Sequence, residues 1–383
     1  MTVFPPLDHL AWWLAAFVLG TCVGSFLNVV IYRMPLGISV NDPKRSFCPG
    51  CKAPIPMRRN IPLVSWLALR GKCPDCGGRI SVRYFAVELL TGLLFSAVWW
   101  VVVERAGADR LEWSHAAALP LWFLVSALVA ISFIDAEHLI IPLELTISST
   151  VAGVVAAVLM PVLPDMVGWS SVDPGWLDGL KSAVLGGVIG YFGLWAVVLL
   201  GKLAFGKMEW KHEAAVAWYL EEPKGEEDPI RFHMGEASVD WWDLFYRKSD
   251  KLVIEAESVR VNGGDAVVGE VVIREDGVTL ADGSEVKLED LKSLEGTARR
   301  AVVPREAMGM GDVHLMGVIG AFFGWFGVFF ALLAGSLLAI AAAVLGRIGF
   351  GMRLPFGPFL AMGALCWLFG GWKLAEWYLE SLR

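Results

Sequence analysis

The stretch AAALPLWFLVSALVAISFID, residues 116–135, decides the fold because it is an apolar run that ends in an aspartate. A helix of about 20 apolar residues can cross the roughly 30 Å hydrocarbon core of a bilayer. A second aspartate, Asp312, follows Gly309-Met310-Gly311 at the edge of another apolar segment. Isolated carboxylates are costly there, but two that meet can share one proton and activate water, as in aspartic proteases. The sequence therefore predicts a membrane-embedded protease with Asp135 and Asp312 as its catalytic pair.

The composition agrees with a polytopic membrane protein. Hydrophobic residues make up 56% of the 383 residues, and 18 residues are Trp, which is too apolar for an ordinary soluble domain. The only turn signal between the last long apolar runs is Gly324-Trp325-Phe326-Gly327. We expect an all-α polytopic fold with about eight transmembrane helices, beginning near His9, Tyr84, Ala116, Leu143, Leu180, Val313, Gly327 and Pro355.

Basic residues set the expected orientation. Residues 33–83 hold ten Lys or Arg and two Asp, whereas residues 165–178 hold no Lys or Arg. Because short cytoplasmic loops are enriched in Lys and Arg, we expect the first loop to be cytoplasmic and the N-terminus to face outward. The first apolar run lacks a basic region before it and a small-residue cleavage signature after it, so we interpret it as a retained anchor. Alternation of the spans then places Asp135 and Asp312 on the cytoplasmic face.

The chain divides into five predicted segments. These are a first transmembrane anchor (1–33), a cytoplasmic tetra-Cys zinc domain (34–83), the first part of a membrane core (84–206), a polar cytoplasmic insertion (207–303) and the second part of the core (304–383). The net charge of −7 comes largely from the insertion, and no nucleic-acid footprint is visible.

The insertion is expected to be a small α+β or β-rich module. Residues 252–254, 259–261 and 267–273 are rich in β-branched side chains, and Gly-containing turn signals separate them. Residues 212–222 mix apolar and charged side chains and predict an amphipathic helix at the membrane surface. Two roles stay open, a solvated addition or a docking surface for a partner.

Four cysteines form two CxxC knuckles in the basic loop: Cys48, Cys51, Cys73 and Cys76. In a reducing compartment such thiols are more often metal ligands than disulfides, and four thiolates suit tetrahedral zinc. A filled coordination sphere leaves no position for water, so we expect a structural zinc; two disulfides would require the opposite topology. Cys22 and Cys366 lie in apolar runs and are interpreted as inert.

Each aspartate also has a plain structural interpretation. Asp135 can be an interfacial helix cap, and Asp312 can be an N-cap. Glu137 and His138 compete with Asp135 as acid or base candidates, although solvated roles fit them better. We interpret His314, two residues after Asp312, as a peripheral polar contact.

The segments taken together resemble the bacterial prepilin peptidases, the type IV leader peptidases of the GxGD aspartic membrane proteases. The resemblance covers nearly all of the chain except the insertion. It rests on the two CxxC knuckles and on GSFLNVVIYR at 24–33, RYFAVELLTG at 83–92, REAMGMGD at 305–312 and PFGP at 355–358.

The resemblance implies a two-step enzyme of the bacterial cytoplasmic (inner) membrane. It would cut the basic leader from type IV prepilins or type II secretion pseudopilins and then methylate the new N-terminal amine with S-adenosylmethionine. Its partners would be these substrates, membrane lipid and a pilus or secretion assembly machinery. By resemblance, Asp135 and Asp312 are catalytic, with their individual roles unassigned. Asn28, Arg33 and Glu88 are candidates for the methyl-donor site or for substrate contact, or else they brace helices.

Three features depart from the family pattern. Leu143 follows Pro142 where the family often has Asp, and His314 stands where a Lys is common. Neither change removes a catalytic carboxylate. The third departure is the long insertion before Gly309, which can gate substrate entry and bears on substrate range more than on chemistry.

Three other functions remain to be weighed. An enzyme with peptidase activity alone, like the archaeal preflagellin peptidases, generally lacks the Cys loop that this chain has. A transporter or channel can use two intramembrane aspartates as an ion path, but its path should continue through further polar residues, and the remaining spans hold few besides Glu88. A noncatalytic assembly scaffold would tolerate the loss of either aspartate.

Overall fold

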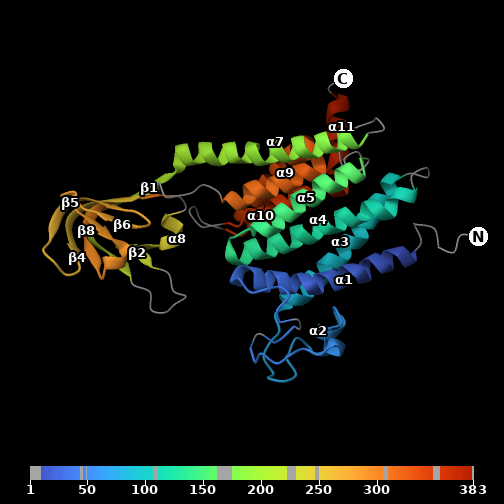
Figure 1. The fold of residues 1–383 in the computed structure, drawn as a ribbon, viewed down its shortest axis with the longest axis horizontal. Helices are drawn as coiled ribbons and strands as arrows, with labels where there is room; N and C mark the ends of the chain where they lie inside the picture. The colour runs from blue at the N-terminus through green and yellow to red at the C-terminus, as the bar shows by residue number, and fades with distance from the viewer. Residues whose placement is uncertain are drawn as a thin grey trace, which may run out of the picture. The chain divides into compact units, whose positions relative to one another are not determined.

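A computed structural model describes residues 10–43, 46–48, 50–106, 111–161, 175–221, 230–245, 250–304, 309–347 and 354–381. The chain divides into two compact units (Figure 1). One unit consists of Met1–Trp195 and Met310–Arg383, and the other is Ala196–Gly309. The second unit begins and ends slightly outside the predicted insertion, residues 207–303.

Apolar helices build the first unit. Five described helices are long and apolar enough to cross a membrane: α1 (Leu10–Arg33), α3 (Val82–Ala106), α4 (Leu111–His138), α7 (Trp176–Phe205) and α9 (Met310–Leu345). The shorter helices are α2 (Val64–Ala68), α5 (Leu143–Leu159), α10 (Gly357–Cys366) and α11 (Trp372–Ser381). The multi-span interpretation is therefore confirmed, although the long helices number five against the predicted eight.

Side-chain hydrogen bonds join the first helices to one another. Ser96 Oγ of α3 donates to Trp13 O of α1 at 3.2 Å, and Trp122 Nε1 of α4 donates to Phe95 O of α3 at 3.0 Å. Such bonds between helices suit a membrane setting, because a polar group facing hydrocarbon has no water to bond. They fix the relative positions of the three helices that carry most of the candidate site residues.

Helix α9 folds back on itself at Gly324. That residue has φ 66° and ψ −174°, which is not helical. A Cβ placed on Gly190 of α7 would lie 2.2 Å from Met316 O and 3.2 Å from Val328 Cγ2. These two residues would be about 18 Å apart along a continuous helix, so the chain must reverse between them. The break lies inside the predicted turn at residues 324–327, and it makes α9 two antiparallel helices.

The second unit is an eight-stranded antiparallel sheet with the order β3-β2-β1-β8-β4-β5-β6-β7. Its strands are β1 (Lys207–Glu221), β2 (Arg231–Met234), β3 (Ala237–Asp240), β4 (Leu252–Val261), β5 (Val267–Ile273), β6 (Gly277–Thr279), β7 (Glu285–Lys287) and β8 (Leu294–Pro304). A short helix, α8 (Trp241–Leu244), follows β3. The three predicted β-rich segments, 252–254, 259–261 and 267–273, all lie in strands.

The predicted amphipathic helix at residues 212–222 is wrong, because all of these residues but the last lie in β1. Apolar side chains at Val216, Trp218 and Leu220 recur with a period of two, which suits a half-buried strand. Trp218 is fully buried and packs in the core of the sheet with Phe232. Tertiary burial of this one face therefore outweighs the local helical tendency.

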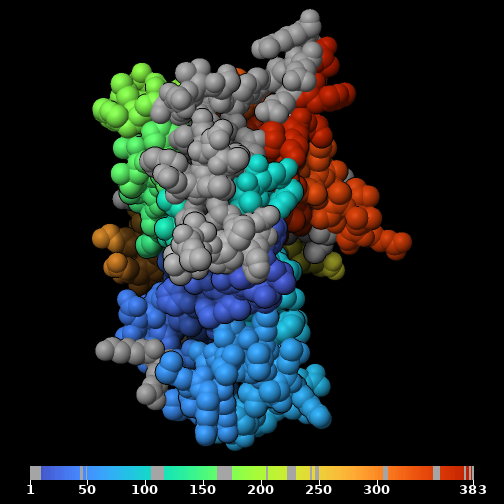
Figure 2. All heavy atoms as spheres, turned by 90° about the vertical axis from the view of Figure 1, so that its right-hand side faces the viewer, coloured from blue at the N-terminus to red at the C-terminus, as the bar shows by residue number. Residues whose placement is uncertain are grey.

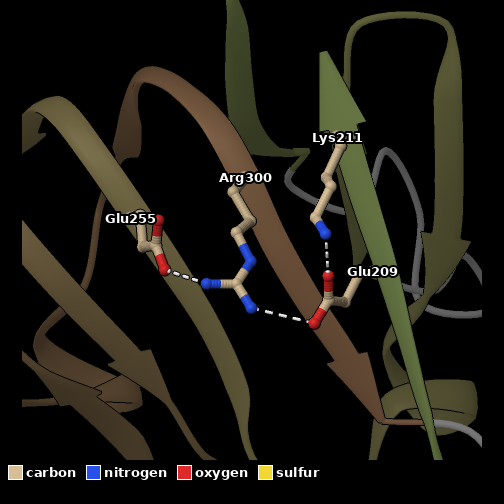
Figure 3. A network of polar contacts seen from close by, with 4 residues as sticks. All are labelled: Glu209, Lys211, Glu255 and Arg300. Atoms are coloured by element: carbon tan, nitrogen blue, oxygen red, sulfur yellow. Dashed lines mark hydrogen bonds and ion pairs between the residues drawn. The ribbon is translucent and has the colours of Figure 1, made fainter.

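A charged network crosses three neighbouring strands of the sheet (Figure 3). Arg300 of β8 pairs with Glu209 of β1 and Glu255 of β4, and Lys211 pairs with Glu209. The Lys211 ammonium and the Arg300 guanidinium lower the pKa of Glu209 to about 2. Each carboxylate here has a cation beside it, so the network holds strands together.

Candidate functional site

The two aspartates of the first unit meet at helix ends. Asp135 lies in the last turn of α4, and Asp312 lies in the first turn of α9. They are 6% and 7% exposed, and the Asp135 carboxyl acts electrostatically on Asp312. The structure thus brings together two residues that the sequence separates widely. No described Lys, Arg or His forms an ion pair with either carboxylate.

Glycines allow the backbone to approach this pair closely. Gly357 N, in the first residue of α10, donates to Asp135 Oδ2 at 2.9 Å. A Cβ on Gly357 would lie 2.8 Å from the same oxygen, and a Cβ on Gly311 would lie 2.7 Å from Ile141 Cβ. A larger residue at either position would displace the wall of the site. The Gly of the PFGP segment is a site residue that sequence reasoning did not single out.

The other acid and base candidates lie around the pair. Glu137 forms an ion pair with Arg83 at the start of α3, and His138 is exposed. His314 Nδ1 contacts Met310 O at 2.9 Å, and its ring packs edge-on against Tyr191. Glu137 and His314 thus have partners outside the carboxyl pair, and the interpretation of His314 as a peripheral polar contact stays a prediction.

The four cysteines of the basic loop form one cluster. Their sulfurs all lie within 4.8 Å of one another, with Cys48 Sγ 4.0 Å from Cys76 Sγ and Cys51 Sγ 4.0 Å from Cys73 Sγ. Each CxxC turn is closed by a backbone hydrogen bond, from Lys52 N to Cys48 O and from Gly77 N to Cys73 O, both 2.8 Å. A tetrahedral zinc with Zn–S bonds of about 2.3 Å places its sulfurs roughly 3.8 Å apart. The cluster is therefore consistent with a metal site and contains no disulfide.

The thiols differ in acidity. The backbone N–H of Cys51 lowers the pKa of Cys48 to about 7. At Cys51 the N–H of Ala53 favours the thiolate, but desolvation and the neighbouring thiols outweigh it and raise the pKa to about 12. Four thiolates this close repel one another, so a cation is needed to hold all of them ionised.

A cavity of about 480 Å³ lies between helices α1 and α3 and the cysteine-containing stretch that connects them, which we call the Cys segment. In Figure 2 the Cys segment, in light blue, forms a lobe beside α1. Asn28, Arg33 and Glu88, which the sequence analysis named together, all line this cavity. Sequence reasoning missed its aromatic walls, which come from Tyr32, Phe47, Trp66 and Tyr84. Tyr32 and Tyr84 lie inside the quoted motifs, and Phe47 directly precedes Cys48, so three of the four stand beside sequence signals.

The three named residues contact their surroundings in different ways. Arg33 donates to Ser39 O, Val40 O and Pro43 O at 2.9–3.1 Å, so it braces the loop after α1. Glu88 accepts the N–H of Leu63 at 2.7 Å and so joins α3 to the Cys segment.

Of the three named cavity residues, Asn28 has a hydrogen-bond acceptor without a partner among the described residues. Its Nδ2 donates to Tyr84 O at 3.0 Å, whereas its Oδ1 is buried and has no partner among the described residues. The amide is therefore held between α1 and α3 with one acceptor left over.

Some predicted features lie outside the described residues. They are residues 1–9 of the anchor, Pro49 of the first CxxC turn, Arg305–Met308 of the REAMGMGD segment and most of the outer loop at 165–178.

Two family models match the chain. Residues 18–102 match the bacterial peptidase A24 N-terminal domain, and residues 291–344 match the type IV leader peptidase family. The first match includes all four clustered cysteines and the three named cavity residues, and the second includes Asp312.

Curated proteins named prepilin leader peptidase/N-methyltransferase are similar to the chain. The protein of Myxococcus xanthus is 43% identical over 175 residues, which are 46% of this chain and 44% of that protein. The protein of Neisseria gonorrhoeae is 36% identical over 233 residues, 54% of this chain and 73% of that protein. The protein of Aeromonas hydrophila is 33% identical over 251 residues, 57% of this chain and 78% of that protein. No solved structure matches the chain.

Proposed function

Because the chain belongs to the prepilin leader peptidase/N-methyltransferase family, we propose that it removes prepilin leaders with the carboxyl pair of Asp135 and Asp312 and then methylates the new amine. The observation that carries the proposal is this buried pair, at the end of α4 and the start of α9, with no ion pair to a cation among the described residues. One carboxylate takes a proton from water, and the other, protonated, polarises the scissile carbonyl. The attack adds water across the peptide bond and releases the leader.

The substrate and the site share a position in the membrane. A prepilin carries a basic leader in the cytoplasm and an apolar helix in the bilayer, so its cleavage site lies at the cytoplasmic interface. The ten basic residues of segment 33–83 favour the cytoplasmic side for the start of α3, and alternation of the spans then favours the same side for the end of α4. We place the enzyme in the bacterial inner membrane with about eight spans, counting both halves of α9, and with pseudopilins of type II secretion as further substrates.

Methyl transfer is assigned to the cavity beside the Cys cluster. S-adenosylmethionine, bound there, would supply an electrophilic methyl group to the pilin amine. Asn28, Arg33 and Glu88 would hold the two reactants, with Glu88 providing the negative charge that suits a sulfonium or an ammonium. The mixed aromatic and charged lining supports this assignment, because aromatic faces bind both adenine rings and cations.

A zinc ion in the Cys cluster would be structural. Cys48 and Cys73 are buried beside the cavity, and all four sulfurs are taken as ligands. The ion would fix the Cys segment over α1 and α3 and so keep the cavity in shape.

The test uses the full chain in detergent with a prepilin and S-adenosylmethionine, followed by mass spectrometry of leader loss and methyl gain. We expect the wild type to perform both steps and Asp135→Asn and Asp312→Asn to cleave far more slowly than the wild type. Asp178→Asn is the matched control, because Asp178 is an exposed aspartate at the start of α7 with a 64% exposed side chain.

Other outcomes support the competing functions. Cleavage without methyl gain would indicate a peptidase alone. Unchanged cleavage in both aspartate variants would refute the aspartic mechanism. No cleavage of several pilins by a folded wild type would favour a transporter or an assembly scaffold.

A further inference from the structure

The two aspartates differ in their hydrogen-bond surroundings, which points to different protonation states. We propose that Asp135 is the ionised base that activates water and that Asp312 is the protonated acid that polarises the scissile carbonyl. This assignment rests on the proposed peptidase function and divides the chemistry between the two carboxyls.

Asp135 meets the N-terminus of a helix. Gly357 is the first residue of α10, and its N–H points to Asp135 Oδ2 at 2.9 Å in a buried contact. The first N–H groups of a helix lack partners within the helix and carry partial positive charge. A hydrogen bond donated to a carboxylate favours its charged form. The fold therefore supplies a fixed donor that stabilises negative charge on Asp135.

Among the described residues, no backbone or side-chain group donates a hydrogen bond to Asp312. It lies in the first turn of α9 and is 7% exposed, yet its Oδ1 is buried without a partner among the described residues. An ionised oxygen without hydrogen bonds is costly to bury, whereas a protonated carboxyl costs less and has an O–H to donate. Because two close carboxylates do not both ionise readily, the shared proton belongs on Asp312.

The roles follow through both halves of hydrolysis. Asp135 takes a proton from water as the water oxygen bonds to the carbonyl carbon, and Asp312 gives its proton to the carbonyl oxygen. The C–N bond of the tetrahedral intermediate then breaks. Asp135 passes its proton to the leaving amine, and Asp312 regains a proton from the hydroxyl group as the new carboxyl forms. Water is consumed, and both side chains return to their starting states.

An asymmetric pair predicts asymmetric losses on amidation. Asn at position 312 keeps a neutral N–H donor that can polarise the carbonyl, whereas Asn at position 135 cannot accept the proton of water. In single-turnover cleavage with excess full-length enzyme, we expect Asp312→Asn to retain a rate at least about 10-fold above that of Asp135→Asn. Equal losses, or a faster Asp135→Asn variant, would overturn the assignment while leaving the two-aspartate peptidase intact. A wild type that cleaves no pilin would overturn both.

The donor itself is tested by backbone replacement. Substituting the α-hydroxy analogue of glycine at position 357 exchanges the N–H for an ester oxygen and adds no Cβ. We expect kcat for cleavage to fall about 10-fold or more with KM within about twofold, because the lost bond is to a charged group. The same ester at Gly363, which lies inside α10 away from Asp135, is the matched control and should leave kcat within about twofold. An unchanged kcat at position 357, or an equal fall at both positions, would contradict the role of this contact.

Discussion

Two groups of carboxylates in this protein have opposite surroundings. Glu209 and Glu255 share Arg300 on the surface of the sheet, so every charge has a partner (Figure 3). Asp135 and Asp312 are buried at the ends of apolar helices, close enough to interact electrostatically, and neither forms an ion pair with a cation among the described residues. Paired charges contribute to folding, whereas a buried carboxyl pair without a cation costs free energy, and such a cost is typical of functional sites. The comparison separates structural from reactive acids better than their residue type does.

The largest expected effect is the loss of leader cleavage when one carboxyl of the buried pair is replaced. Asp135→Asn should lower the rate of leader cleavage by about 10⁴-fold, because no other described group is placed to take the proton of water. Glu209→Gln removes the same charge from the sheet and should leave cleavage within about twofold. Single-turnover assays on both variants check this, and a comparable loss in the two would show that charge alone, not position, matters.

The Cys cluster offers a second comparison, because its four thiols would become a group of like charges once ionised. Cys48→Ser should abolish tight zinc binding and reduce methyl transfer at least about 10-fold, since the cavity wall loses its support. Elemental analysis of the purified chain and methylation of a pre-cleaved pilin measure the two effects. Cys22→Ser, a change outside the cluster, should alter neither, and retained zinc in Cys48→Ser would refute the ligand assignment.

The paired acids predict a smaller effect on stability. Arg300→Leu removes the cation that Glu255 contacts and leaves Glu209 with Lys211 alone, on the two strands that flank β8, and should speed amide exchange in β1 and β8, with cleavage unchanged. Arg299→Leu is the control, because Arg299 contacts a single glutamate and its side chain is 61% exposed. Equal exchange in the two variants would mean that the network adds nothing beyond isolated surface pairs.

The smallest effect concerns pH. The pKa of Glu209 falls from 4.5 to about 2 on folding, so its contribution is present above about pH 4.5 and is lost as the pH drops toward 2. Glu209→Gln should therefore flatten the acid loss of β1 protection over that window. Hydrogen exchange of the wild type and the variant at several acidic pH values measures it, and parallel curves would argue against the linkage.

Local sequence patterns indicated the candidate reactive residues of this protein better than they indicated contacts between distant segments. Asp135, Asp312 and the CxxC knuckles could be singled out because residue type, spacing and neighbouring apolar runs are local signals. The Gly357 contact was missed because it joins segments 222 residues apart, a separation that no local pattern spans. The break at Gly324 was marked by its glycines, but only packing against α7 fixes the reversal.

The sheet shows where local reasoning failed. Residues 212–222 combine helix-forming Ala, Leu and Glu with charges, so a helix was expected. The alternation of Val216, Trp218 and Leu220 was the better signal, because burying Trp218 in the sheet core requires a strand. The cavity was half anticipated: its polar residues stood in recognisable motifs, while its aromatic walls come together only in the fold.

If the carboxyl pair and the cavity beside the Cys cluster are two separate reaction sites, cleavage and methylation must be separable in one variant. Asp135→Asn is given a full-length prepilin and a pre-cleaved pilin together with S-adenosylmethionine, and leader loss and methyl gain are read in the same mass spectra. We expect no leader loss from the prepilin and wild-type methylation of the pre-cleaved pilin. Leader loss at the wild-type rate, or the disappearance of both activities in a folded variant, would contradict this expectation.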